Sequence, residues 1–74
     1  MAKLPRDMIS QSRVIAKGNR IREVRRLVRQ YGGKISQWTK KSSPSFRIGQ
    51  HLFEFHWYEH RGLGRFEIKR KRVE

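Results

Sequence analysis

The stretch HLFEFHWYEH, residues 51–60, decides the fold because two kinds of side chain alternate along it. Phe53, Phe55 and Trp57 occupy one set of alternate positions, and mainly polar side chains occupy the other set. Since successive side chains of a strand point to opposite faces of a sheet, this pattern predicts a strand with one apolar and one polar face. We expect the aromatic face to form the core and the polar face to remain open.

The residues that follow predict the second arm of a hairpin. The turn is RGLG, residues 61–64, whose two glycines tolerate the positive φ angles of tight turns. Alternation then resumes as far as residue 72, and it places Phe66 and Ile68 on the aromatic face. The basic tail KRKRVE, residues 69–74, is expected to fray at its end.

Residues 19–31 predict an amphipathic helix. Gly18 and Asn19 suit its N-terminal cap, and Gly32 with Gly33 suits its end, because glycine tolerates the left-handed conformation there. The apolar side chains recur at helical spacing and fall within an arc of about 120°; they are Ile21, Val24, Leu27, Val28 and Tyr31.

The remaining segments complete a small sheet. A strand is expected around residues 37–42 and a shorter one near Phe46, with a bend at Ser42, Ser43 and Pro44 between them. Residues 1–18 leave two alternatives open, a short helix after Pro5 or an edge strand in SRVIAKG, residues 12–18. The 74 residues therefore predict a single α+β domain, with an N-terminal helix or helices packed on one face of a small antiparallel sheet.

Charge is the strongest global feature of the chain. Nineteen Lys and Arg residues face six Asp and Glu residues, which gives a formal net charge of +13. A polyanion relieves the resulting self-repulsion, so nucleic acid or an acidic protein is the expected partner. An anionic membrane surface is less favoured, because the aromatic residues fall in strand patterns and not on the helix. No uncharged run approaches the length of a membrane span.

The expected polar face carries residue types that together suit RNA cleavage. The imidazole of His56 can donate or accept a proton near neutral pH. A carboxylate can act as base or orient the imidazole, Tyr58 can donate a hydrogen bond or stack on a base, and cations can stabilise the charge on the phosphate. RNA carries its own nucleophile, so this chemistry needs no metal. The side chains expected on this face are Glu54, His56, Tyr58, Arg65, Glu67 and Lys69, bordered by Lys40 or Lys41.

These polar residues also have a plainer explanation. A half-buried strand presents a solvated face, where polar side chains are ordinary. The grouping of a histidine, a tyrosine and two glutamates among cations, in a chain of net charge +13, strengthens the chemical interpretation.

Neither a metal site nor a serine nucleophile is expected. His56 and His60 have the spacing that brings two imidazoles together on a helix. In a strand the same spacing separates them by roughly 13 Å. The run SSPS, residues 42–45, lacks the glycine elbow that exposes a nucleophilic serine. The chain also lacks cysteine, so no disulfide is possible, and no cofactor is expected.

Two longer runs, IREVRRLVRQYGGKISQWTKKSSPSF and FEFHWYEHRGLGRFEIK, resemble the C-terminal toxin domains of bacterial polymorphic and contact-dependent toxins. The matching features are a basic helix ending in Tyr-Gly-Gly at residues 31–33, Trp-x-Lys-Lys-Ser-Ser at 38–43, and His-Trp-Tyr-Glu at 56–59. Such domains are mostly ribonucleases. Many have the fold shared by barnase, EndoU, colicin-type tRNases and RelE, a helical layer on an antiparallel sheet.

The resemblance implies functional roles for Lys40, Lys41, His56 and Tyr58. It also implies an acidic immunity or antitoxin protein that blocks the site. Action in the cytoplasm is implied as well, after delivery from another cell if the chain belongs to a larger toxin.

We therefore hypothesise a metal-independent endoribonuclease toxin. His56 is expected to act as general acid or base, with Glu54 or Glu67 orienting it or serving as the complementary base. The residues expected to hold the phosphate are Lys40, Lys41, Arg65 and Lys69, and those expected to attract RNA or an acidic inhibitor are Arg22, Arg25, Arg26 and Arg29. The alternatives are a non-catalytic nucleic-acid-binding module that uses the same basic face, and a domain that binds only an acidic protein.

Overall fold

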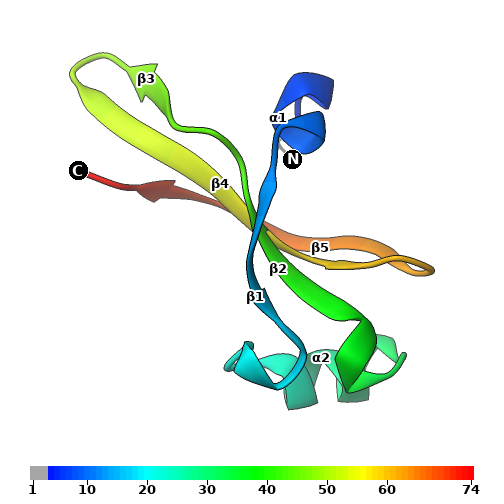
Figure 1. Ribbon diagram of the computed structural model, residues 1–74. Helices are drawn as coiled ribbons and strands as arrows, with labels where there is room; N and C mark the ends of the chain where they lie inside the picture. Colours follow the sequence, from blue (N-terminus) through cyan, green and yellow to red (C-terminus); the bar gives the residue numbers. More distant parts are fainter. Residues whose placement is uncertain (1–3) are drawn as a thin grey trace.

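The computed structural model describes residues 4–74, which form a small α+β fold built on a five-stranded antiparallel sheet (Figure 1). This is the expected fold class. The elements in chain order are α1 (Arg6–Ser10), β1 (Arg13–Lys17), the 3₁₀ turn η1 (Gly18–Arg20), α2 (Val24–Tyr31), the 3₁₀ turn η2 (Ile35–Gln37), β2 (Trp38–Ser42), β3 (Phe46–Ile48), β4 (His51–His60) and β5 (Gly64–Arg72).

Strand β4 is the centre of the sheet. It pairs with β5 over residues 53–60 on one edge, while β2 and β3 pair with its two ends on the other edge. Ser43 bridges the gap between β2 and β3, because its N–H donates to the Phe55 carbonyl and its hydroxyl accepts from the Phe55 N–H, both at 2.9 Å. Strand β1 pairs with the outer edge of β2. Figure 1 shows how strongly the sheet twists, since the β3–β4 and β4–β5 turns point in different directions.

The predicted elements in the N-terminal part are both present. A short helix, α1, follows Pro5, and residues 13–17 then form the edge strand β1. The two alternatives for this segment therefore occur one after the other. The expected strands near residues 37–42 and Phe46 are confirmed as β2 and β3.

Helix α2 is shorter than expected at its beginning. It begins at Val24 and not at residue 19, because Ile21 adopts an extended backbone (φ −80°, ψ 118°) that places its side chain in the core, 2% exposed. Burial of one apolar side chain thus prevails over the local helical pattern. The helix ends as predicted at Gly32, whose φ is 99°.

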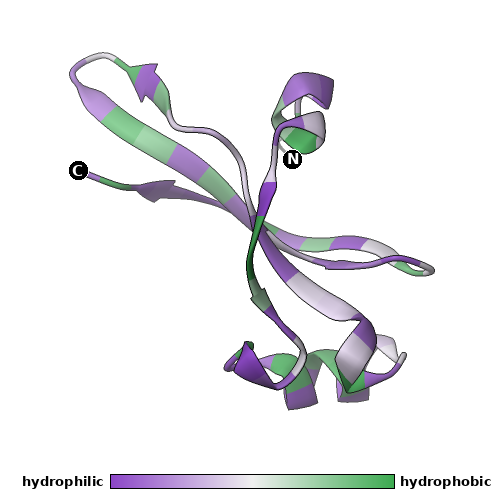
Figure 2. Cartoon of the chain, in the orientation of Figure 1, coloured by the Kyte–Doolittle hydropathy of each residue, from purple (hydrophilic) through white to green (hydrophobic). Residues whose placement is uncertain are grey.

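The main core lies between α2 and the sheet. Its buried members are Ile21, Val24, Leu27 and Trp38. Tyr31 of the helix stacks on Phe66 of β5, with ring centroids 4.2 Å apart. In Figure 2, apolar and polar residues alternate in colour along α2, as in an amphipathic helix.

The face of the sheet that α2 covers differs from the prediction. Tyr58 and Phe66 pack against the core cluster under α2, whereas Phe53 and Phe55 lie on the other face and are half-buried. Trp57 lies on the same face of β4 as Phe53 and Phe55, and it is 1% exposed. Trp38 pairs in register with His60 and therefore lies on the Tyr58 face, where it is fully buried.

The register of β5, which contains a bulge, explains a second difference. Phe66 lies opposite Tyr58 and Lys69 lies opposite His56, so Glu67 and Ile68 together face the single residue Trp57. Glu67 has φ 56°, an unusual conformation for a residue with a side chain. Phe66 precedes the bulge, and the pairing of His60 with Gly64 at the turn places it opposite Tyr58, on the face under α2. The bulge then returns Lys69 to the face of His56.

The C-terminal tail does not fray as expected. Strand β5 continues to Arg72, and the Val73 N–H donates to the Leu52 carbonyl at 3.0 Å. The basic residues from Lys69 onward are therefore held in register with β4. Within residues 4–74, no helix is long and apolar enough to cross a membrane.

Truncation of the core should test the packing of α2. Leu27 is fully buried, so Leu27→Ala should lower the free energy of unfolding by about 2–5 kcal/mol. The matched control is Arg25→Ala, an exposed residue of the same helix, which should change it by less than about 0.5 kcal/mol. Urea unfolding followed by circular dichroism measures both, and equal losses would contradict this packing.

Candidate active site

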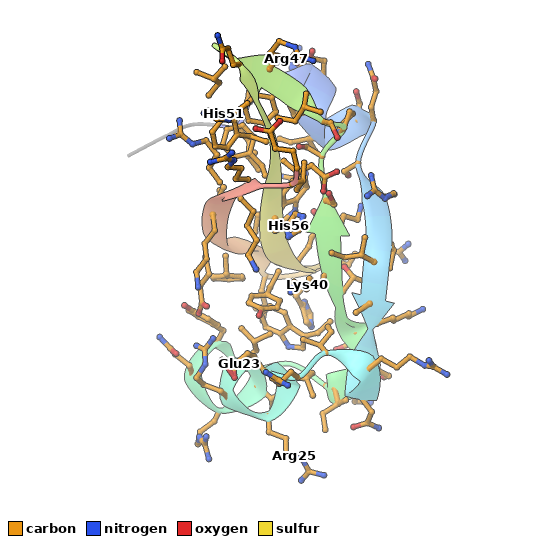
Figure 3. The ribbon with its side chains drawn as sticks, turned by 90° about the vertical axis from the view of Figure 1, so that its left-hand side faces the viewer. Glu23, Arg25, Lys40, Arg47, His51 and His56 are labelled. Carbon is orange, nitrogen blue, oxygen red and sulfur yellow. The ribbon has the colours of Figure 1, made fainter. Side chains whose placement is uncertain are left out.

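The site follows from the different lengths of α2 and β4. Eight helical residues extend about 12 Å, whereas the ten residues of β4 extend about 33 Å. Helix α2 therefore covers the end of β4 that carries Tyr58 and His60. The same face continues uncovered through His56 and Glu54. Figure 3 shows His56 and Lys40 on this side of the sheet, between α2 and the end that carries Arg47 and His51.

A small pocket of about 50 Å³ opens where α2 stops covering the sheet. Its walls come from β2, β4 and β5, and the residues that line it are Lys40, His56, Trp57, Tyr58, Glu67, Lys69 and Lys71. Five of these were predicted from the sequence to lie together. The pocket thus combines an imidazole, a phenol, a carboxylate and three ammonium groups.

His56 and Glu54 form a pair beside this pocket. The Nε2 atom of His56 lies 3.0 Å from a carboxylate oxygen of Glu54, two residues earlier on the same face of β4. The side chains are 16% and 12% exposed, so water competes little for this bond. The pair is the predicted one, with Glu54 in contact with the histidine.

Glu54 is held by more partners than the histidine alone. The hydroxyls of Ser42 and Ser45 donate to its two oxygens at 2.8 and 3.0 Å, and Arg13 lies 3.6 Å away. The hydrogen bond from His56 contributes most, and with the serine hydroxyls and Arg13 it outweighs the opposing effect of burial and lowers the pKa of Glu54 to about 2. Glu54 is consequently ionised at neutral pH and is a fixed hydrogen-bond acceptor. Neither the serines nor Arg13 were among the site residues predicted from the sequence.

The charge of Glu54 determines which nitrogen of His56 carries the proton. A carboxylate can only accept, so the proton of the neutral imidazole must lie on Nε2. Nδ1 is then left as an unprotonated acceptor. This atom is buried and has no hydrogen-bond partner among residues 4–74. A buried polar atom without a partner is rare, and functional sites are one place where such atoms occur.

The three lysines that line the pocket form no ion pair with a carboxylate of the described residues. No carboxylate oxygen of the described part of the chain lies within 4.0 Å of the ammonium group of Lys40, Lys69 or Lys71. Lys40 lies over the ring of Tyr58, 5.8 Å from its centroid. Lys71 was not among the predicted site residues, although its alternation with Lys69 could have shown that both lie on one face.

Two predicted site residues lie on the opposite face of the sheet. Lys41 and Arg65 both contact Glu59, at 3.4 and 3.1 Å, and Glu59 also accepts from the Trp57 indole. Burial alone would raise the pKa of Glu59, but the indole, Lys41 and Arg65 together lower it below its usual value. Lys41 lies on the opposite face because side chains alternate along β2 and Lys40 occupies the pocket face. Arg65 lies there because it comes before the β5 bulge. Neither side chain reaches the pocket.

Glu67 lines the pocket but is engaged elsewhere. Its two oxygens accept from Arg26 at 2.8 and 2.9 Å, and one of them also accepts from the Tyr31 hydroxyl at 2.9 Å. The bond from Arg26 is the main reason that the pKa of Glu67 falls to about 2, although burial opposes the shift. Glu67 is thus a structural tie between the sheet and α2. It does not contact His56, so the role of complementary base proposed from the sequence does not suit it.

Tyr58 remains protonated over a wide range of pH. Burial raises the pKa of its hydroxyl, and the nearby carboxylates of Glu23 and Glu67 raise it further. Tyr58 can therefore act as a hydrogen-bond donor in the pocket at neutral pH.

The arginines of the α2 region divide into two groups. Arg26 points to the sheet and binds Glu67, and its pKa is raised chiefly by that bond. Arg22, Arg25 and Arg29 are exposed, as expected for groups that attract a polyanion.

The other two histidines are not part of the pocket. His60 is buried beside Trp38; its Nδ1 accepts from the Gly62 N–H at 3.0 Å, and Nε2 lies 3.0 Å from the Gln37 side-chain oxygen. A Cβ atom on Gly33 would lie 2.4 Å from the His60 ring, so this ring leaves room only for glycine at this position after α2. His51 is exposed and contacts Glu74. No group of three or more potential metal ligands occurs in the described residues.

Comparison of the chain with protein-family models, with curated proteins and with solved structures gave no significant match.

The two low carboxylate pKa values predict acid sensitivity. Glu54 and Glu67 have folded-state pKa values of about 2, below the ordinary value of 4.5. Each therefore contributes stability that is fully present above pH 4.5 and is lost as the pH falls toward 2. The urea midpoint should drop across this interval.

Removing Arg26, the main partner of Glu67, should abolish the contribution of Glu67 to this pH dependence of stability. Arg26→Ala should flatten the profile between pH 4.5 and 2 and lower the midpoint at pH 7. Arg29→Ala, an exposed residue of the same helix, should keep the wild-type profile. Parallel profiles for the two variants would show that the Arg26–Glu67 contact does not cause the effect.

Proposed function

We propose that the chain is a small metal-independent endoribonuclease. The observation that carries the proposal is the imidazole of His56, which is hydrogen-bonded to the ionised Glu54 and lines a pocket with the ammonium groups of Lys40, Lys69 and Lys71. Its Nδ1 is buried and has no hydrogen-bond partner among the described residues. A phosphodiester brings to this pocket a hydroxyl proton for the imidazole and a negative charge for the lysines. The resemblance to toxin domains agrees with this function.

The proposed reaction begins at the ribose. Nδ1 of His56 takes the proton of the 2′-hydroxyl, and the 2′-oxygen forms a bond to the adjacent phosphorus. The resulting imidazolium is stabilised by the ionised carboxylate of Glu54 through its Nε2 proton. Glu54 is in this scheme a positioning residue that fixes the ring and its tautomer.

The reaction ends when the bond from phosphorus to the 5′-oxygen breaks. The phenol of Tyr58 gives its proton to the leaving oxygen, and the products are a 2′,3′-cyclic phosphate and a free 5′-hydroxyl. Lys40 and Lys69 lie on either side of the β4 residues in the pocket and stabilise the charge that develops on the non-bridging oxygens. Exchange with solvent restores the proton of Tyr58 and removes that of His56.

An acidic inhibitor protein is a second proposed partner. Arg22, Arg25 and Arg29 are exposed and form no ion pair among the described residues, so an acidic protein surface could contact them as well as the lysines of the pocket. Action on cytoplasmic RNA is the setting that this proposal implies.

Incubation of labelled RNA with the protein in EDTA tests the proposal. We expect cleavage of RNA and not of DNA, with 2′,3′-cyclic phosphate ends, because DNA lacks the attacking hydroxyl. His56→Ala should lower the rate by at least about a hundredfold. His51→Ala, the exposed histidine of the same strand, should keep the wild-type rate.

The adjacent lysines of β2 provide a matched pair for the same assay. Lys40→Ala should lower kcat/KM by about tenfold or more, since an electrostatic contact to the transition state is lost. Lys41→Ala removes the same charge from the opposite face and should have little effect. Circular dichroism confirms the fold of each variant. RNA that is bound but left intact by the wild type would refute catalysis and indicate a nucleic-acid-binding module.

A further inference from the structure

We infer that Lys71 forms a second phosphate site, next to the one at His56, and that the substrate is an unpaired RNA strand running along β5 away from α2. This inference rests on the proposed function and adds the class of substrate. It arises from a residue that the cleavage scheme does not use.

The spacing of two lysines on β5 suits successive phosphates. Lys69 lies opposite His56 and Lys71 lies opposite Glu54, so both share the face of the proposed reaction. Alternate residues of a strand are about 6.8 Å apart. This distance is comparable with the separation of neighbouring phosphates in an extended single strand. When one phosphate lies between His56 and Lys69, the next one reaches Lys71.

Lys71 is free to bind an anion. It is exposed, and the carboxylate opposite to it, Glu54, is occupied by His56, Ser42 and Ser45. No ion pair within 4.0 Å involves Lys71 in the segment from residue 4 to the C-terminus. Its charge therefore remains available for a ligand.

The other direction along β5 is closed. Phe66 and Tyr58 lie under α2, and Arg26 binds Glu67 at the boundary of the covered region. A strand that leaves the pocket along the sheet must therefore pass over Lys71 and not over Phe66. Helix α2 thus gives the binding path its direction.

The recessed position of His56 favours an unpaired strand. The side chain is 16% exposed and lines a pocket of about 50 Å³ whose walls come from β2, β4 and β5. A flexible single strand can bend one phosphodiester into such a recess and turn its bases outward. A duplex holds its backbone rigidly against a second strand, which would meet α2.

Binding of short uncleavable ligands tests this inference separately from catalysis. The probes are RNA dinucleotides with a 2′-deoxy residue at the cleavage position, each with no additional phosphate, a 5′-phosphate or a 3′-phosphate. We expect one terminal phosphate to tighten binding to the wild type at low salt by about two- to fivefold, the strength of one exposed ion pair. Lys71→Ala should lose this gain and Lys71→Arg should retain it.

The control for Lys71 is its neighbour on the opposite face. Arg70 lies over the ring of Phe53, so Arg70→Ala lowers the net charge equally without removing the proposed contact. It should retain the gain from the terminal phosphate. For longer single strands, Lys71→Ala should reduce the slope of log Kd against log salt by about 0.7.

Two results would overturn the inference. One is an unchanged gain in Lys71→Ala, and the other is an equal loss in Arg70→Ala. Equal dependence on Lys71 for a blunt RNA duplex would refute the preference for unpaired strands. Because the probes lack the attacking hydroxyl, these outcomes remain interpretable even if the protein cleaves no RNA.

Discussion

Helix α2 covers only part of the longest strand, and the rest of the structure depends on this difference in length. About 12 Å of helix cannot cover about 33 Å of β4. The covered part provides the main core, with Trp38 and Leu27 fully buried. The uncovered part of the same face presents Glu54 and His56 at the edge of the core. A residue there is shielded enough for a strong hydrogen bond and open enough to meet a ligand.

The bulge in β5 joins the core to the pocket. Phe66 enters the core just before the bulge, and Glu67, one of the two residues opposite Trp57, reaches back to α2. The positive φ of Glu67 is a strained conformation, and its bonds to Arg26 and Tyr31 offset that strain. The same carboxylate forms a wall of the pocket beside Tyr58. Helix position and pocket shape are thus coupled through one side chain.

Much of this arrangement could be predicted from alternation and helical spacing. The strands, the turn after β4, the end of α2 and the grouping of Glu54, His56, Tyr58 and Lys69 all followed from the sequence. The face that α2 covers did not, because the polarity of β4 was considered without the register that places Trp38 on the Tyr58 face. Phe66 lies on the other face from the one predicted because Gly64 already pairs with His60, and this register of the turn was not specified by the alternation alone. The predicted positions of Lys41 and Arg65 were wrong for a related reason, because the face on which each side chain lies depends on strand register.

In the proposed reaction, Glu54 holds His56 with Nδ1 unprotonated, so that this atom can accept a proton from the ribose. Two-bond ¹H–¹⁵N NMR spectra of the three histidines, with and without an uncleavable 2′-deoxy dinucleotide, test this arrangement. We expect neutral His56 to carry its proton on Nε2, and we expect the dinucleotide to shift the His56 signals while leaving those of His60 in place. A proton on Nδ1 of His56, or His56 signals that do not respond to the dinucleotide, would contradict it.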